Sequence, residues 1–353
     1  MEIEKNLKNS LNSFSHLSEE EENQNFDYLQ KLLFYKEKFQ NCKKRDITGH
    51  KKRVYTLDWL NHNNSNTLIT GSADTTIKIW DINNINDYLL EIKGNNDSIT
   101  NLSSNPESSF IFLSTSADKY IKLWDIRMNL LNNNNSSIKS FHSEKTKNGI
   151  KHIIFNNSGT QFAYSSRDGN CLFIYDLSNF KQIKQIDFKT QINEFEFNKT
   201  DTKLFITDDN GHINILNASN YDEINMIEGH FFPINCINIS KTNKNFITGG
   251  LDSLIVMYDM KELMSLKVFK RSEQCIKKCQ FSYDEKFIAS IYEGTNVDFF
   301  SVELGCPTFT IYTDNSEYCI KWNNKNNILA YCGDDKNNHG GEDGNVHLIE
   351  ILY

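Results

Sequence analysis

Two stretches of this sequence are near copies: residues 116–126 read SADKYIKLWDI, and residues 72–82 read SADTTIKIWDI. They carry the same residue at eight of eleven positions, and they start 44 residues apart. Each ends in a short alternating run of β-branched and aromatic residues, which is the pattern of a β-strand. A strand that recurs at this spacing predicts an array of similar structural units.

The ending of the repeat recurs, in altered form, along the chain. Seven stretches match it: IKIWDI (77–82), IKLWDI (121–126), LFIYDL (172–177), INILNA (213–218), IVMYDM (255–260), VDFFSV (297–302) and VHLIEI (346–351). Two strand-like runs precede each ending, and a fourth run follows most of them, as at 88–93 and 266–270. Four antiparallel strands at a period of about 40–45 residues are typical of a β-propeller blade of the WD40 type. The sequence therefore predicts an all-β, seven-bladed propeller.

The WD40 resemblance also implies a buried hydrogen-bonded relay in each well-kept blade. In that family a His before the first strand, a Ser or Thr on the second, an Asp in the next turn and a Trp on the third are linked. The matching positions in blades 1, 2 and 5 are His50, Ser72, Asp74 and Trp80, then Ser116, Asp118 and Trp124, then His230 and Asp252. Because the relay recurs once per blade whereas an active site occurs once, we interpret these residues as structural.

The ends of the chain suggest how the ring closes. The seventh ending is followed by no fourth strand, whereas residues 39–48 belong to no blade of their own. Since proteins rarely leave a sheet edge bare, we predict that this N-terminal segment supplies the outer strand of blade 7. The propeller would then span residues 39–353. Residues 1–38 would form an extension with an amphipathic helix whose Phe26, Leu29 and Leu33 share one face, and which packs on a blade or binds a partner.

Composition and motifs argue against an enzyme. The formal net charge is −8, no apolar run approaches the ~18 residues of a membrane span, and the eight cysteines include no C-x-x-C pair. Buried free thiols favour a reducing compartment. The sequence contains no G-x-S-x-G, phosphate-binding glycine loop or H-E-x-x-H, so we predict no catalytic residue, cofactor or metal. The loop 334–344 resembles a calcium loop but lacks its final Glu, and we interpret Asp334 and Asp335 as part of an exposed turn that a partner could bind.

Two other loops are candidate partner sites. Lys51, Lys52 and Arg53 form a basic cluster where the chain enters blade 1, which is either a solvated rim or a dock for an acidic helix or RNA phosphates. Phe231 and Phe232 lie in the equivalent loop of blade 5 and could anchor an interface. We expect one of the two rings to pack inward.

Across nearly the whole ring the chain resembles the WD40-repeat family of THO complex subunit 3. The resemblance is carried by INEFEFNKTDTKLFITDDNGHINIL (192–216), MIEGHFFPINCINISKTNKNFITGGLDSLIVMYDMKELMSLKVFKRS (226–272), CQFSYDEKFIASIYEG (279–294) and ILAYCGDDK (328–336). It implies a nuclear, non-enzymatic scaffold in the assembly that couples transcription to messenger-RNA packaging and export. It also implies docking on the large helical THO subunit and other THO subunits, with the DEAD-box export helicase as an indirect partner, RNA contact at most weak and no membrane.

An alternative function comes from residues 124–127. Trp124-Asp125-Ile126-Arg127 resembles the W-D-x-R box of substrate receptors for cullin-4 ubiquitin ligases. In that interpretation Arg127 would contact the ligase adaptor. The sequence alone leaves both alternatives open, since an Arg at the end of a strand can also simply be solvated.

Overall fold

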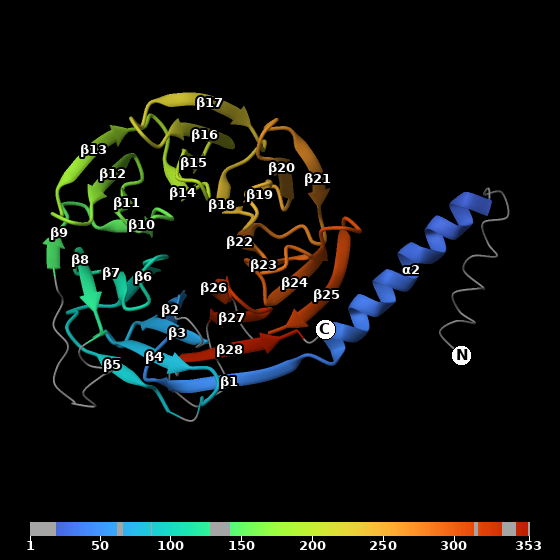
Figure 1. The fold of residues 1–353 in the computed structure, drawn as a ribbon, viewed down its shortest axis with the longest axis horizontal. Helices are drawn as coiled ribbons and strands as arrows, with labels where there is room; N and C mark the ends of the chain where they lie inside the picture. Colours follow the sequence, from blue (N-terminus) through green and yellow to red (C-terminus); the bar gives the residue numbers. More distant parts are fainter. Residues whose placement is uncertain are drawn as a thin grey trace.

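Seven four-stranded antiparallel sheets form a closed ring (Figure 1). The computed structural model describes residues 19–61, 66–85, 87–127, 142–313, 317–333 and 344–351. Each blade is given from its innermost strand outward: blade 1 is β2 (Val54–Leu60), β3 (Thr67–Ser72), β4 (Ile77–Asp81) and β5 (Leu90–Ile92), and blade 2 is β6 (Ile99–Ser104), β7 (Ile111–Ser116), β8 (Tyr120–Asp125) and β9 (His142–Lys145). Blade 3 is β10 (Ile150–Phe155), β11 (Gln161–Ser166), β12 (Cys171–Asp176) and β13 (Gln182–Asp187), blade 4 is β14 (Ile192–Phe197), β15 (Lys203–Asp208), β16 (His212–Asn217) and β17 (Glu223–Glu228), and blade 5 is β18 (Ile234–Ile239), β19 (Asn245–Gly250), β20 (Ile255–Asp259) and β21 (Ser265–Phe269). Blade 6 is β22 (Ile276–Phe281), β23 (Phe287–Tyr292), β24 (Asn296–Ser301) and β25 (Cys306–Tyr312), and blade 7 is β26 (Glu317–Trp322), β27 (Ile328–Gly333), β28 (Gly344–Glu350) and β1 (Lys43–His50). The predicted seven-bladed propeller is confirmed.

The hydrophobic core is divided among the joints between blades. Each of the seven apolar clusters combines residues from neighbouring blades, and the cluster of Val54 and Trp80 with Val346 and Leu348 joins blade 1 to blade 7. The second strand of each blade is buried on both faces, as in β3, where all six residues are buried. This explains why the second strands read as continuous apolar runs. Each blade therefore buries both faces of its sheet against its two neighbours, and these apolar contacts between blades stabilise the fold.

The ring closes where the prediction placed it, on a strand from the N-terminal segment. β1 pairs antiparallel with β28, with Lys43 opposite Glu350 and Ile47 opposite Val346. Two side-chain contacts cross this joint: Arg45 Nη2 lies 3.5 Å from a Glu350 carboxylate oxygen, and His347 Nδ1 lies 2.6 Å from one of Asp46. The strand spans Lys43–His50 and not residues 39–48, because α2 (Glu19–Gln40) continues through Phe39.

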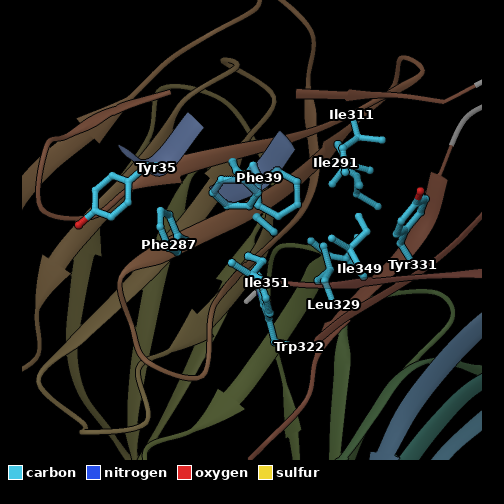
Figure 2. Packing of buried hydrophobic residues seen from close by; sticks show 14 residues of the cluster. Tyr35, Phe39, Phe287, Ile291, Ile311, Trp322, Leu329, Tyr331, Ile349 and Ile351 are labelled. Carbon is cyan, nitrogen blue, oxygen red and sulfur yellow. The ribbon is translucent and has the colours of Figure 1, made fainter. Parts of the chain in front are cut away.

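Helix α2 is anchored at its C-terminal end and projects away from the ring toward its N-terminus (Figure 1). Tyr35 and Phe39 insert into the cluster that joins blades 6 and 7 (Figure 2). The Phe39 ring is fully buried, 4.6 Å from Phe299 and 5.0 Å from Phe287 between ring centroids. These two residues anchor the helix, whereas Phe26 of the predicted apolar face is 43% exposed. The apolar cluster of blades 6 and 7 thus decides which face of the helix packs on the ring.

The innermost strands are joined by a belt of side-chain acceptors. On five of them, a side-chain oxygen of the fifth residue of the innermost strand accepts a backbone N–H of the next blade: Asp58 from Ser104, Ser103 from Phe155, Glu196 from Ile239, Asn238 from Phe281, and Gln280 from Trp322. These N–H groups lie on the free edge of each sheet, which faces the central axis and has no strand to pair with. The belt satisfies these edges and fixes the spacing of the blades.

Candidate interaction face

The connections between strands lie on two opposite faces of the ring. Because strands alternate in direction, the turns between second and third strands and the connections from one blade to the next share one face, which we call the loop face. The basic loop 51–53, the Phe231–Phe232 loop and the Asp residues of the predicted relays all lie on it. All candidate partner residues with described positions except Arg127 therefore lie on one surface.

In blade 1 a chain of hydrogen bonds links the loop face to the core. Asp74 Oδ2 lies 2.9 Å from His50 Nδ1, His50 Nε2 lies 2.7 Å from Thr70 Oγ1, and Trp80 Nε1 donates to Thr70 Oγ1 at 2.9 Å. A carboxylate only accepts, so Nδ1 carries a proton, and in the neutral ring Nε2 accepts from the Thr70 hydroxyl. The groups resemble a catalytic triad, but His50 and Thr70 are both buried, which supports a structural role.

The hydroxyl in this relay belongs to Thr70 and not to the predicted Ser72. Ser72 instead donates to the Lys52 carbonyl at 2.9 Å and accepts from the Asp74 N–H at 3.0 Å, which holds the turn. The reason is register: Trp80 lies opposite Leu68, so its indole reaches the next residue on the same face, Thr70. Ser72 is two residues further along, beyond the reach of the ring. The sequence did contain a signal for this alternative, because a residue with a hydroxyl group lies two positions before each predicted Ser.

Blade 2 shows the same shift and lacks the first half of the relay. Trp124 Nε1 donates to Ser114 Oγ at 2.8 Å, whereas the predicted Ser116 donates to the Asp97 carbonyl at 3.0 Å. Asp118 accepts from the Tyr120 N–H at 3.0 Å and so caps its turn. Asn95 replaces the His, and its buried Nδ2 has no hydrogen-bond partner among the described residues.

Blade 5 keeps the first half of the relay and changes the second. His230 Nδ1 lies 2.8 Å from Asp252 Oδ2, and its Nε2 lies 2.8 Å from Thr248 Oγ1. Tyr258, in place of Trp, turns its hydroxyl to the Gly229 carbonyl at 3.0 Å. Burial raises the pKa of this phenol to about 12, so it stays protonated and donates at neutral pH.

Electrostatics hold the blade 1 relay in one charge state. Although burial by itself raises the pKa of Asp74, hydrogen bonds to the carboxylate from His50, Thr76 and the Lys51 N–H outweigh it and hold the pKa well below its usual range. Thr76 Oγ1 donates at 2.6 Å and the Lys51 N–H at 2.9 Å. Asp74 is therefore ionised at neutral pH and fixes the loop that carries the basic cluster.

Blade 4 replaces the relay with a buried carboxylate that the sequence analysis did not identify. Asp208 occupies the strand position of Ser72 and is 2% exposed. It accepts from Thr190 Oγ1 at 2.9 Å and from the N–H groups of Asn210 and His212 at 3.0 and 2.9 Å. The sequence signal is the pair Asp208-Asp209, at a position where five of the other six blades have Ser or Gly.

The Phe231–Phe232 loop presents both rings to solvent. Phe231 is 97% exposed and Phe232 is 57% exposed, so the expectation that one of them packs inward is wrong. The base of the loop is nevertheless fixed: the N–H groups of Gly229 and His230 donate to the Gly211 carbonyl at 2.9 and 3.1 Å. An apolar pair on a loop held this firmly loses little conformational entropy when a partner covers it.

The remaining candidates lie in different settings. Lys51 and Lys52 are exposed, and Arg53 is half-buried. Arg127, at the end of the third strand of blade 2, folds back on Asp125, to which its Nε donates at 3.0 Å. Asp334 and Asp335 lie outside the described residues.

A group of titratable residues lies on the innermost strands, around the central axis. Glu194 contacts Lys278 from two blades away, and His152 Nε2 lies 3.8 Å from the same carboxylate oxygen. Burial, and then the charge of Lys278, lowers the pKa of His152 well below its usual value. Glu194 also accepts from the Ile237 N–H at 3.1 Å, so both its oxygens are occupied and it is poorly placed to act as a base.

The described part of the chain contains neither a metal-binding cluster nor a membrane-spanning helix. None of its His, Cys, Asp and Glu side chains gather in threes at metal-binding distance. None of the helices it contains is long and apolar enough to cross a membrane.

Comparison with known proteins places the chain among β-propellers. The family model for the NUP159/214 beta propeller matches residues 97–331, and that for the WD domain, G-beta repeat, matches residues 41–81. The chain is 29% identical to THO complex subunit 3 of Arabidopsis thaliana over 314 residues, which cover 88% of this chain and 96% of that protein. It is 23% identical to WD repeat-containing protein AAC3 of Dictyostelium discoideum (70% of this chain, 54% of that protein) and 24% identical to protein SOF1 of Saccharomyces cerevisiae (70% and 63%).

Proposed function

Because the chain belongs to the NUP159/214 β-propeller family and is a homologue of THO complex subunit 3, we propose that it is a scaffold subunit of a THO-type complex. The similarity to the plant THO subunit extends over 88% of this chain and 96% of that protein. This is the observation that carries the proposal. The protein works in the nucleus, where the complex couples transcription to messenger-RNA packaging and export, and it has no catalytic activity.

In this proposal the protein binds partners through rigid, preformed surfaces. It docks on the large helical subunit of the complex and contacts the DEAD-box export helicase only through the assembly. Phe231 and Phe232 are suited to anchor the dock, since large apolar rings at the centre of an interface carry much of its binding energy. Their loop is held by the His230–Asp252 pair, so the blade 5 relay contributes to binding by positioning the loop.

A pull-down from nuclear extract tests this function. We expect the tagged protein to retain other THO subunits after nuclease treatment, since the contacts are between proteins. A double variant, Phe231→Ser with Phe232→Ser, should lose most of the recovered subunits. Met264→Ser with Leu266→Ser is the matched control, because these residues of the same blade are 67% and 51% exposed but lie on the rim.

Two outcomes would contradict the proposal. Recovery of a cullin-4 adaptor in place of THO subunits would favour the ubiquitin-ligase alternative, in which Arg127 makes the contact. Recovery that disappears with nuclease would mean that RNA, and not a protein interface, holds the assembly together. If the two double variants lose equal amounts of recovered THO subunits, membership in the complex would still hold, but the Phe pair would not be its anchor.

A further inference from the structure

Three cations gather on the loop face where blades 2 and 3 meet. Lys119 lies in the turn between β7 and β8, Lys147 in the connection to β10, and Arg167 in the turn between β11 and β12. All three are exposed, and none forms an ion pair with a carboxylate of the described chain. A protein surface normally intersperses its charges, so unpaired cations in one place require a reason.

The backbone holds these cations together. Lys119 Nζ donates to the Lys147 carbonyl at 3.3 Å, and the Lys119 carbonyl accepts from the Thr146 N–H at 2.9 Å. The Arg167 N–H donates to the Gly149 carbonyl at 3.1 Å. A Cβ placed on Gly149 would lie within 3.8 Å of both Lys119 and Arg167 side chains, so these two side chains flank one glycine. The three turns therefore form one rigid unit.

The local charge is positive although the chain as a whole is acidic. The carboxylates in the same turns are Asp118 and Asp168, and Asp118 accepts backbone N–H groups of Asn96 and Tyr120. Three cations against two carboxylates leave an excess of positive charge, on a chain whose formal net charge is −8. Lys51 and Lys52 extend the positive field along the same face into blade 1.

Aromatic rings lie on the same loop face, at the innermost strands of blades 1 and 7. Tyr55 and Tyr318 are the second residues of β2 and of β26, at the loop-face end of those innermost strands. Their ring centroids lie 5.6 Å apart, edge to face, and Lys277 Nζ lies 5.7 Å from the Tyr318 ring. Both tyrosines are only partly buried. Cations for phosphates and aromatic faces for bases are the two elements of single-strand binding surfaces.

We propose that the loop face of blades 1 to 3 binds single-stranded nucleic acid. Phosphates contact Lys119, Lys147 and Arg167, and a base stacks at Tyr55. An acidic helix of a partner protein would also bind the cations. It would not need exposed aromatic rings, however, and a straight helix cannot follow a curved surface that extends over three blades. The proposal rests on this surface alone and not on membership in a THO-type complex.

The test uses the full chain and a fluorescein-labelled 20-nucleotide oligouridine, with binding followed by fluorescence anisotropy between 50 and 200 mM salt. The variant Lys119→Gln, Lys147→Gln, Arg167→Gln should bind about tenfold more weakly or worse at 100 mM salt. Its slope of log affinity against log salt should fall by about 2, since each phosphate contact on a single strand contributes about 0.7. Gln removes the charge and keeps a polar, unbranched side chain, although one that is shorter than Lys or Arg.

Two comparisons separate specific contact from general charge. Lys241→Gln, Lys244→Gln, Lys261→Gln removes the same charge from turns on the opposite face and should change affinity less than about twofold. Tyr55→Leu should weaken binding about fivefold or more, and Tyr55→Phe should restore it, because stacking needs the ring and not the hydroxyl. Melting temperatures of all variants show whether each one is folded.

Several results would overturn the proposal. These are no binding by the native chain, equal losses in the two triple variants, or a duplex that binds as tightly as the single strand. Competition by polyglutamate as effective as that by oligouridine would assign the surface to an acidic protein. Each of these results is independent of the nuclease-resistant pull-down, so the two proposals can fail separately.

Discussion

Single residues of the relay set the local stability of blade 1, and Thr70 is central to it. Its hydroxyl satisfies both His50 Nε2 and Trp80 Nε1. We expect Thr70→Val, which keeps the shape, to leave both ring nitrogens unpaired and to lower the free energy of unfolding by about 2–4 kcal/mol. Urea denaturation measures this loss.

Ser72→Ala is the control for this substitution. Ser72 bonds only backbone groups at the end of the strand, so its loss should cost about 1 kcal/mol or less. A cost for Ser72→Ala that equals or exceeds that of Thr70→Val would contradict the assignment of the relay.

The Asp74 carboxylate makes part of the stability depend on pH. Its folded-state pKa lies below the value of about 3.9 in an unfolded chain. Its contribution is therefore fully present above about pH 4 and is lost as the pH falls toward the folded pKa. We expect the stability difference between the native chain and Asp74→Asn to be constant at pH 5–7 and to shrink below about pH 4. Chemical denaturation at each pH measures it.

The equivalent turn of blade 3 supplies the control for this pH dependence. Asp168 is exposed there and accepts no side-chain bond from a His. Asp168→Asn should change stability by less than about 0.5 kcal/mol across the range. If the stability difference between the native chain and Asp74→Asn stayed constant down to pH 2, ionisation of this carboxylate would not be the source of the pH dependence.

At the scale of elements, helix α2 is held to the ring chiefly by the buried ring of Phe39. The side chain contacts the ring of Phe287 (Figure 2) and those of Phe299 and Phe309. We expect Phe39→Ala to lower the free energy of unfolding by about 3–5 kcal/mol, as other buried Phe truncations do. Phe34→Ala changes a ring on the same helix that is 49% exposed, and should cost less than about 1 kcal/mol. Comparable losses in guanidinium melts would mean that the helix does not dock as described.

At the scale of the whole molecule, the belt around the axis couples the blades. Gln280 accepts the Trp322 N–H at 2.8 Å and so links blade 6 to blade 7. Gln280→Leu should strand this buried N–H and cost about 1–3 kcal/mol. Because the ring is closed, we expect one cooperative transition at lower temperature, seen equally by Trp fluorescence and circular dichroism. Gln185→Leu on an exposed outer strand is the control and should be nearly neutral.

The relay and the helix depend on contacts that local sequence patterns do not specify. In blade 1 the repeat places His50 before the first strand, Asp74 in the turn after the second and Trp80 on the third, and the period of two along a strand predicts which side chains share a face. It does not decide between Thr70 and Ser72, since both lie on the same face and only the pairing register shows which one the indole reaches. In α2, the apolar period favoured Phe26, whereas Tyr35 and Phe39 fill a space that blades 6 and 7 create.

The sequence by itself determined the number of blades, the order of strands in each and the segment that closes the ring, because these follow from local periodicity and from counting strands. The tertiary structure alone decided which cations of the loop face stand together, which Phe rings remain exposed and which side chains satisfy the innermost sheet edges. The physical reason is separation along the chain. Lys119 and Arg167, or Gln280 and Trp322, become neighbours only when sheets that pack through apolar faces are wound around a common axis.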